Sequence, residues 1–459
     1  MPGTSISTAC RPKPKRLSTP FRPIRSNMKK IFLLCLLFTA ALTACQKDEG
    51  PAPGERPEER LSAALSAYKA QLISSPFGWK ATLYPEGGGG YNFMFTFKED
   101  DRVLMTSDIN ASAATPMETT YRLKTMQRPS LLFDTYSYLH ILSDPDPDVI
   151  GGDVGAGKYS DFEFSFTEVT PDVITLTGNI MGSRMVLTRA TQADAESFIA
   201  GITASAQTFS NLSRFTSYFR RLTIGTNTFD LNLDLNNRII TFMYFEGDVA
   251  RTFSTSFSYT AGGMLLQEPF AAAGVSILSF DAVQYNAAGN LFNLTVGGAA
   301  ATIQEAARPV RVDVQAARNF HNAGSDYWAS PGGFTINGVP DAHNLRALPN
   351  FFQIGYWAKY DVFQNREYDL LGFLLLNAAG NALELTYGIA AAPTFTSDGR
   401  IVYSVLGTLG TIPESHRVAV TATLQQWADT QGYYLIRTSE TTADLVSARD
   451  GKAWLPLFR

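Results

Sequence analysis

The sequence is poor in the residues that most often carry cross-links and metal chemistry. Its 459 residues include three cysteines and four histidines. Cys10 and Cys35 precede a predicted cleavage site, so only Cys45 would remain in the processed chain. We therefore expect no disulfides, and stability must come from packing of the apolar residues, which form 45% of the chain.

The motifs of several enzyme classes are missing. The sequence has no H-E-x-x-H pair, which would place two histidines one helical turn apart to share zinc, and no G-x-S-x-G elbow or phosphate-binding P-loop. His140 follows Tyr136 and Tyr138 in a predicted strand, which favours a packed, hydrogen-bonded side chain over a catalytic base. We assign no catalytic residue, no metal ligand and no cofactor. The histidines are scattered: His140, His321, His343 and His416.

Two loops have the composition of ligand sites but not their spacing. Carboxylates at alternate positions suit Ca²⁺, yet Val149 and Gly155 stand where an EF-hand needs glycine and glutamate. A solvated turn is the better interpretation. The tetraglycine loop Gly87–Gly90 lacks the following helix and lysine of a phosphate cradle, which favours a flexible hairpin loop. The acidic residues concerned are Asp144, Asp146, Asp148, Asp153 and Asp161.

Aromatic residues form 12% of the chain and offer one further candidate site. An exposed pair could stack against a sugar ring, although most aromatic side chains of an alternating β-protein belong to its core. The pattern does not distinguish the two roles, so the ligand-binding residues stay unassigned. The candidates are Trp79, Tyr84, Tyr91, Trp328, Tyr356, Trp357, Trp427 and Trp454.

Acidic residues are absent from the first 44 positions, which have the layout of an export signal. Lys29 and Lys30 precede an apolar run, Ile31–Leu42, that is shorter than the roughly 20 residues needed to span a bilayer. The sequence from Leu42 to Cys45 resembles a bacterial lipobox, which implies lipidation of Cys45 and cleavage before it. We expect a signal peptide over residues 1–44, with translation starting at Met28. An ordinary secretory signal followed by a chance cysteine is the alternative.

A polar tether over residues 45–55 follows the predicted cleavage site. Its first part, Gln46–Glu49, looks like the acidic signal that sends lipoproteins of Bacteroidota to the outer face of the outer membrane; a plain solvated tether is the alternative. Residues 1–44 hold eight basic residues, so the remaining chain has 30 basic and 42 acidic residues and a net charge of −12. This balance argues against nucleic acid as a partner.

The remaining chain has the pattern of a mainly β protein. A helix is expected over Glu58–Ile73, and residues 91–97 alternate with a period of two. A second helix begins at Thr191, with Asp194 as its capping partner. Residues 91–106, 119–136 and 173–190 have parallels at 229–244, 254–270 and 291–306. We therefore predict antiparallel β-meander domains, sandwich or barrel-like, that are duplicated and each preceded by a short helix: 56–190 and 191–306, with a third β-rich unit at 307–459.

One family shares a set of motifs with residues 55–190. The set comprises Trp79-Lys80-Ala81, Gly88–Tyr91, Leu132–Tyr136, His140, Asp144-Pro145-Asp146 and Ser160–Phe164. On these motifs the chain resembles uncharacterised Bacteroidota lipoproteins of domain-of-unknown-function family 4302. The resemblance implies a lipid-anchored protein encoded beside SusC/SusD-like importers, without a known activity or site residues.

These features lead to a ranked set of functions. We expect a non-enzymatic, surface-exposed outer-membrane lipoprotein that helps capture a glycan or peptide, beside a SusC/SusD-like importer. A secreted hydrolase or a partner of one is the first alternative, and a structural or adhesion protein is the second.

Overall fold

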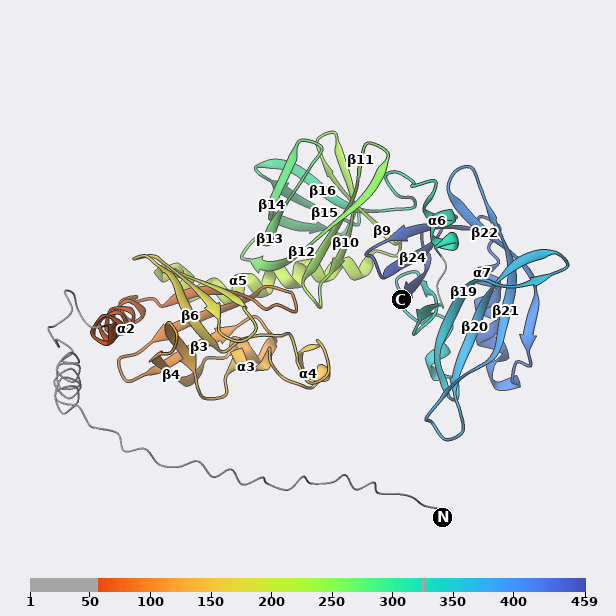
Figure 1. Ribbon diagram of the computed structural model, residues 1–459. Helices are drawn as coiled ribbons and strands as arrows, with labels where there is room; N and C mark the ends of the chain where they lie inside the picture. Colours follow the sequence, from red (N-terminus) through yellow and green to blue (C-terminus); the bar gives the residue numbers. More distant parts are fainter. Residues whose placement is uncertain (1–56, 324–326) are drawn as a thin grey trace, which may run out of the picture. The chain divides into compact units, whose positions relative to one another are not determined.

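The computed structural model describes residues 57–323 and 327–459. The predicted signal peptide, Cys45 and the tether lie outside the described residues. Residues Leu61–Arg459 form one compact unit, in which two closed barrels are followed by a third, antiparallel sheet (Figure 1). The prediction of a mainly β, antiparallel and barrel-like protein is confirmed.

The first barrel has eight strands in chain order, and its last strand pairs with its first. The alternation in residues 91–97 has the expected cause, because Phe93 and Phe95 point into the core and are fully buried. A helix precedes the barrel, and short helical turns interrupt two of its loops. The elements are α2 (Pro57–Ile73), β1 (Trp79–Tyr84), β2 (Tyr91–Phe97), β3 (Arg102–Ser107), η1 (Ala111–Ala114), β4 (Met117–Thr125), β5 (Pro129–Phe133), α3 (Tyr138–Ile141), α4 (Pro147–Ile150), β6 (Glu163–Val169), β7 (Val173–Gly178) and β8 (Arg184–Arg189).

The second barrel repeats this plan after its own helix. Thr191 caps that helix and forms the predicted capping box with Asp194, whose carboxylate accepts the Thr191 N–H at 2.9 Å. The barrel again closes by pairing its first and last strands. Its elements are α5 (Gln192–Ser210), η2 (Asn211–Arg214), β9 (Phe219–Ile224), β10 (Asn227–Asp234), β11 (Ile239–Glu246), β12 (Val249–Thr260), β13 (Gly263–Ala272), β14 (Val275–Asn286), β15 (Leu291–Val296) and β16 (Ala299–Ala306).

The repeat predicted from sequence holds strand by strand. Each segment with a predicted parallel occupies the same place in the strand order of its barrel: β2–β3 corresponds to β10–β11, β4–β5 to β12–β13, and β7–β8 to β15–β16. Each barrel also follows its own helix. The molecule therefore contains repeated β-domains, each with a short helix.

The third sheet is longer and less regular. Its strands follow in chain order, except that the short strand β18 pairs at the end beside β25. One bridge, Ala329 to Phe458, joins β17 to β25 and closes the sheet on itself. Helix α7 interrupts the meander between β22 and β23, which share only two residue pairs. The elements are α6 (Ala316–Asn322), β17 (Trp328–Ser330), β18 (Thr335–Ile336), η3 (Leu345–Ala347), β19 (Phe351–Phe363), β20 (Arg366–Leu376), β21 (Leu383–Phe395), β22 (Arg400–Gly410), η4 (Glu414–His416), α7 (Arg417–Trp427), β23 (Tyr433–Arg437), β24 (Thr442–Ser447) and β25 (Ala453–Phe458).

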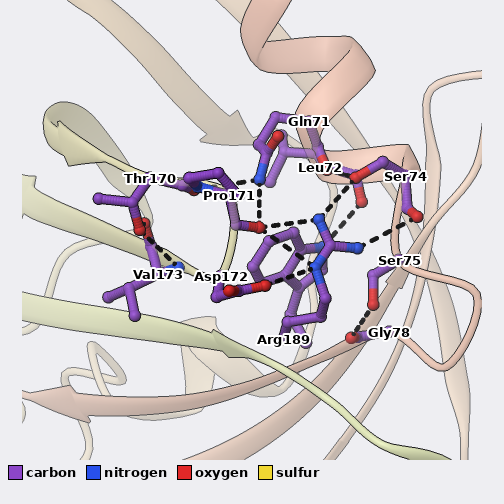
Figure 2. A network of polar contacts seen from close by, with 11 residues as sticks. Gln71, Leu72, Ser74, Ser75, Gly78, Thr170, Pro171, Asp172, Val173 and Arg189 are labelled. Atoms are coloured by element: carbon purple, nitrogen blue, oxygen red, sulfur yellow. Dashed lines mark hydrogen bonds and ion pairs between the residues drawn. The ribbon is translucent and has the colours of Figure 1, made fainter.

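A cluster of polar contacts fastens helix α2 to the first barrel, and we call it the α2 clasp (Figure 2). The Arg189 guanidinium donates to the backbone oxygens of Ser74 and Pro171 and lies 4.9 Å from the Trp79 ring. The Gln71 amide donates to Pro171 O at 2.7 Å, and the Trp79 indole donates to Leu72 O at 2.8 Å. The clasp thereby saturates carbonyl groups at the end of the helix and in the turn before β7.

Some local predictions are wrong. The sequence pattern alone does not predict strands β9, β16 and β25. The pattern of residues 312–319 predicts a short helix, which the structure has at Ala316–Asn322 instead. His140 lies in the helical turn α3, not in a strand, because Ser137 begins that turn. The imidazole Nδ1 accepts the Ser137 N–H at 3.1 Å, so the ring is hydrogen-bonded and structural, as expected.

Candidate functional site

The structure separates the eight candidate aromatic residues into core and surface. Trp454 is half-buried and packs against Tyr218 of the second barrel. Trp357, also half-buried, has aromatic neighbours at the surface. The other six are buried: Trp79, Tyr84, Tyr91, Trp328, Tyr356 and Trp427.

Trp357 is the centre of an aromatic cluster on the outer face of the third sheet. Its ring stacks on Tyr327 at a centroid distance of 4.9 Å and an interplanar angle of 28°. Tyr360, 41% exposed, meets the indole edge-on at 6.2 Å. We call Tyr327, Trp357 and Tyr360 the aromatic cluster. The Tyr327 hydroxyl accepts from the Gln353 amide at 3.0 Å, which fixes one polar group beside the rings.

Glycines allow the indole to lie against the sheet. Gly355 of β19 pairs with Gly372 of β20, which pairs with Gly388 of β21, so three glycines form a row across the sheet. A Cβ atom at Gly355 would lie 2.4 Å from Trp357 Cη2, and one at Gly372 would lie 2.7 Å from its Cζ3. Any side chain at these positions would displace the ring. Gly355 and Gly372 thus make room for the Trp357 indole against the sheet.

A buried carboxylate fixes the backbone beside Trp357. Asp369, fully buried, accepts the Tyr356 hydroxyl at 2.6 Å and the backbone N–H of Lys359 at 2.9 Å. Lys359 has a φ of 54° and lies in an irregularity of the β19–β20 ladder between Trp357 and residue 361. Asp369 therefore anchors the kink between Trp357 and Tyr360 from the buried side of the third sheet.

The network behind this kink is structural in character. His321 Nε2 donates to Asp369 at 2.8 Å, and the Tyr403 hydroxyl donates to the Tyr356 hydroxyl at 3.1 Å. All four side chains are buried. Burial raises the pKa of Tyr356 and of Tyr403 well above the ordinary value, so both phenols stay protonated and act as donors. The network orients the strand that carries Trp357 and has no open side for a substrate.

The aspartates of the acidic loop, Asp144–Asp161, form hydrogen bonds within the protein. Asp146 caps α4 and accepts from the N–H of Asp148 at 3.0 Å, while Asp153 accepts the Tyr159 hydroxyl at 2.7 Å. Asp161 is buried and accepts backbone N–H groups of the β7–β8 turn, including that of Ile180 at 2.8 Å. Within residues 57–323 and 327–459, no group of three or more His, Cys, Asp or Glu side chains is placed to hold a metal ion.

The tetraglycine loop is not a free hairpin tip. Gly89 N donates to the Ser256 hydroxyl at 3.0 Å, and Gly90 N donates to the backbone oxygen of Phe257 at 3.0 Å, so the loop contacts the second barrel. A Cβ at Gly90 would lie 2.6 Å from Tyr84 Cε1 and 2.8 Å from Ser258 Cβ. The prediction of a flexible loop is wrong: the absence of a side chain at Gly90 lets the loop backbone approach the backbone of the second barrel closely.

An ion pair is buried beside this loop. Arg238, 7% exposed, donates to Asp108 Oδ2 at 2.8 Å and to Gly90 O at 2.7 Å. The guanidinium also lies 4.4 Å from the Tyr91 ring and 5.3 Å from the Tyr259 ring. We call this arrangement the Arg238 link, because it joins the two barrels of the compact unit.

Sequence reasoning named Trp357 but not its partners. Tyr327 precedes β17, and Tyr360 lies in the exposed end of β19. Neither residue belongs to an alternating pattern of apolar and polar residues that would draw attention to it. The sequence places Gly355 two residues before Trp357 and Tyr360 three residues after it, which is the only local sign of the cluster. Gly372 and Tyr327 come next to Trp357 only through the pairing of β19 with β20 and β17.

Comparison with known proteins identifies the family. The model for Domain of unknown function (DUF4302) matches residues 54–286, which include the first barrel, α5 and most of the second barrel. The chain belongs to this family. The aromatic cluster lies beyond the matched residues, so the family match does not describe it.

Other comparisons add little. No curated protein matches the sequence. Among solved structures, the octameric penicillin-binding protein homologue from Pyrococcus abyssi matches at 9% identity with a TM-score of 0.15, over 33% of this chain and 37% of that chain. The alignment thus spans well under half of that protein, and a likeness this small informs neither fold nor function. No helix in the described part of the chain has the length and apolarity to cross a membrane.

Proposed function

We propose that this DUF4302 protein is a non-enzymatic lipoprotein, anchored through Cys45 at the outer-membrane surface, that captures a glycan for a SusC/SusD-like importer. The aromatic cluster is the reason for proposing a glycan as the ligand. Tyr327, Trp357 and Tyr360 form a partly exposed aromatic surface on a rigid sheet, and the apolar face of a sugar ring packs well against such a surface. A peptide with aromatic or proline residues is the other ligand that this surface would accept.

Three further observations support the proposal. The sequence layout from Lys29 to Cys45 is that of a lipoprotein signal. The chain belongs to the DUF4302 family, and the resemblance of its motifs to those of Bacteroidota lipoproteins implies a lipid anchor. The cores of the two closed barrels are filled by apolar side chains, which leaves outer surfaces and rims as places for a ligand.

No observation favours the hydrolase alternative. A glycosidase needs two carboxyl groups that face one substrate, about 5–10 Å apart. Aspartates with largely buried carboxyl groups are instead held by contacts within the fold: Asp108 by Arg238, Asp161 by a turn, Asp230 by the Val310 N–H, Asp369 by the Tyr356 network and Asp444 by the Tyr218 hydroxyl.

The test is binding of glycans and peptides to the chain from Gln46 onward, which keeps every described residue. Affinity electrophoresis and calorimetry would measure binding, and the same samples would be analysed for products. We expect saturable glycan binding without products. Trp357→Ala should weaken it by about 30-fold, since a tryptophan at the centre of a contact is worth 2 kcal/mol or more.

Matched variants keep this test independent of folding. Trp357→Phe keeps a ring over the glycines and should weaken binding less than Trp357→Ala does. Tyr360→Ala should weaken it, whereas Tyr136→Ala, which removes another exposed tyrosine from the first barrel, should not. Product release would make the protein an enzyme. Unchanged affinity in Trp357→Ala would remove the aromatic cluster as the site.

A further inference from the structure

A half-enclosed cleft lies at the rim of the second barrel, apart from the aromatic cluster. Its volume is about 370 Å³, within the range of small-molecule sites. The ends of β10, β11 and β12 form one side. Residues 309–316 and the end of β23 form the other.

The floor of the cleft is apolar. Phe229 is 3% exposed, and Met243 and Tyr244 are half-buried. Two aspartates line the cleft: Asp230 accepts from the Val310 N–H at 2.5 Å and from Arg221 at 3.3 Å, and Asp313 accepts from the Gln315 N–H at 2.9 Å. The contacts of Asp230 already satisfy its carboxylate. Burial raises its pKa, which makes it a poor site for a cation. The floor therefore suits a hydrocarbon or aromatic body.

Three arginines line the cleft, and they differ in their partners. Arg251 donates to Glu246 at 3.0 Å, and Arg311 pairs with Asp248 and lies 4.6 Å from the Phe245 ring. Each of these two arginines therefore has an acidic partner: Glu246 for Arg251 and Asp248 for Arg311.

Arg437 is the exception. It is exposed at the end of β23 and lines the cleft, and no hydrogen bond, ion pair or ring contact joins its side chain to another residue of the described chain. A free guanidinium at the edge of an apolar cleft is complementary to a carboxylate, which it can bind through two parallel hydrogen bonds.

We propose that the cleft binds an organic anion, with its apolar body against Phe229, Met243 and Tyr244 and its carboxylate on Arg437. An aliphatic and an aryl carboxylate present the same chemistry, and the experiment distinguishes them. This site is independent of glycan capture at the aromatic cluster.

The probe is 8-anilinonaphthalene-1-sulfonate, an aromatic anion whose fluorescence rises in apolar sites. It would be titrated into the chain from Gln46 onward and displaced by decanoate, 4-phenylbutyrate and the neutral decanol. We expect saturable probe binding, displacement by at least one carboxylate, and weaker displacement by decanol. Arg437→Ala should weaken carboxylate binding about tenfold, the loss expected for a charged hydrogen-bond partner, and leave decanol unchanged.

Two variants make the result specific. Arg366→Ala removes another exposed arginine, in β20, and should change nothing. Ala250→Trp, at an exposed position that lines the cleft, should abolish probe binding by filling the space. Equal displacement by decanoate and decanol, equal effects of Arg437→Ala and Arg366→Ala, or no saturable probe binding would each overturn the proposal. Trp357→Ala should leave the probe unaffected, so failure of one site is distinguishable from failure of the other.

Discussion

The contact between the first and second barrels and the contact between the second barrel and the third sheet differ in their electrostatics. In the Arg238 link, a buried guanidinium meets a buried carboxylate, Asp108, at 2.8 Å. Between the second barrel and the third sheet, the Tyr218 hydroxyl donates to Asp444 at 2.7 Å, and no basic side chain of the described residues forms an ion pair with that carboxyl group. Burial raises the pKa of Asp444 to about 6.

The comparison shows how one compact unit can contain an ion-paired contact and a pH-dependent one. In a buried ion pair, removal of one partner leaves the other charge buried without a counter-ion, which is strongly destabilising. The Asp444 carboxyl group has only the Tyr218 phenol as a partner, so its burial favours the protonated form relative to the same group in water. We therefore expect the two contacts to respond differently to mutation and to pH.

Breaking the Arg238 link should have the largest effect. Asp108→Ala leaves the guanidinium buried without its counter-ion and removes an acceptor of the Asn92 amide, so the free energy of unfolding should fall by about 3–5 kcal/mol. Urea denaturation measures it. Glu246→Ala, in a pair whose partners are both more than half exposed, should cost about 1 kcal/mol or less. Equal losses in the two variants would contradict a special role for the link.

The Asp444 contact should make stability depend on pH. The folded-state pKa of about 6 lies above the value of about 3.9 for an unfolded aspartate, so the folded state binds more protons between the two. The stabilisation is fully present below about pH 4 and is lost as pH rises through about 6, on the order of 1–3 kcal/mol. Denaturation midpoints from pH 4 to 7 measure it. Asp444→Asn should remove this part of the pH dependence; identical profiles for both proteins would refute the assignment.

Crowding the tetraglycine loop should have a smaller effect on the first contact. Gly90→Ala places a Cβ within 3.0 Å of atoms of Tyr84, Ser258 and Phe257, which should cost about 1–3 kcal/mol. The thermal midpoint measures the loss. Gly262→Ala is the matched control, because its Cβ would meet only one atom, at 3.8 Å. A harmless Gly90→Ala would mean that the loop can withdraw from the second barrel.

The smallest expected effect is local. Arg189→Ala removes the centre of the α2 clasp, with its contacts to Ser74, Pro171 and Trp79, and should cost about 1 kcal/mol because the side chain is 27% exposed. Amide hydrogen exchange should accelerate in α2 and not in the strands of the second barrel. Uniform acceleration would show that α2 is not a separate local unit.

Much of the fold could be predicted because most strands of the two closed barrels bury alternate residues. The sequence does not reveal strand β9 because Arg220 and Arg221 interrupt its apolar pattern. In the structure their guanidinium groups donate to the backbone oxygens of Leu233 and Arg308. Strand β16 begins with three alanines, and β25 contains Pro456, both weak strand signals. These segments form strands despite their weak β-propensity, because they pair with neighbouring strands.

The candidate site was less accessible to prediction. Alternation places Tyr356 and Trp357 on opposite faces of β19, but only the packed sheet shows that Tyr356 faces the core. The support of Trp357 comes from Gly372 and Asp369 on the next strand, which no local pattern links to it. The Arg437 side chain likewise gains significance only from the cleft beside it.

The α2 clasp has a mechanical consequence for an anchored protein. In the proposed anchored form, any pull on the membrane tether enters the fold through the start of α2, since the tether directly precedes it in the chain. Arg189, Gln71 and Trp79 hold the far end of that helix. Force would therefore be resisted first by the clasp, whose rupture would lengthen the tether by a helix while both barrels keep their closed sheets.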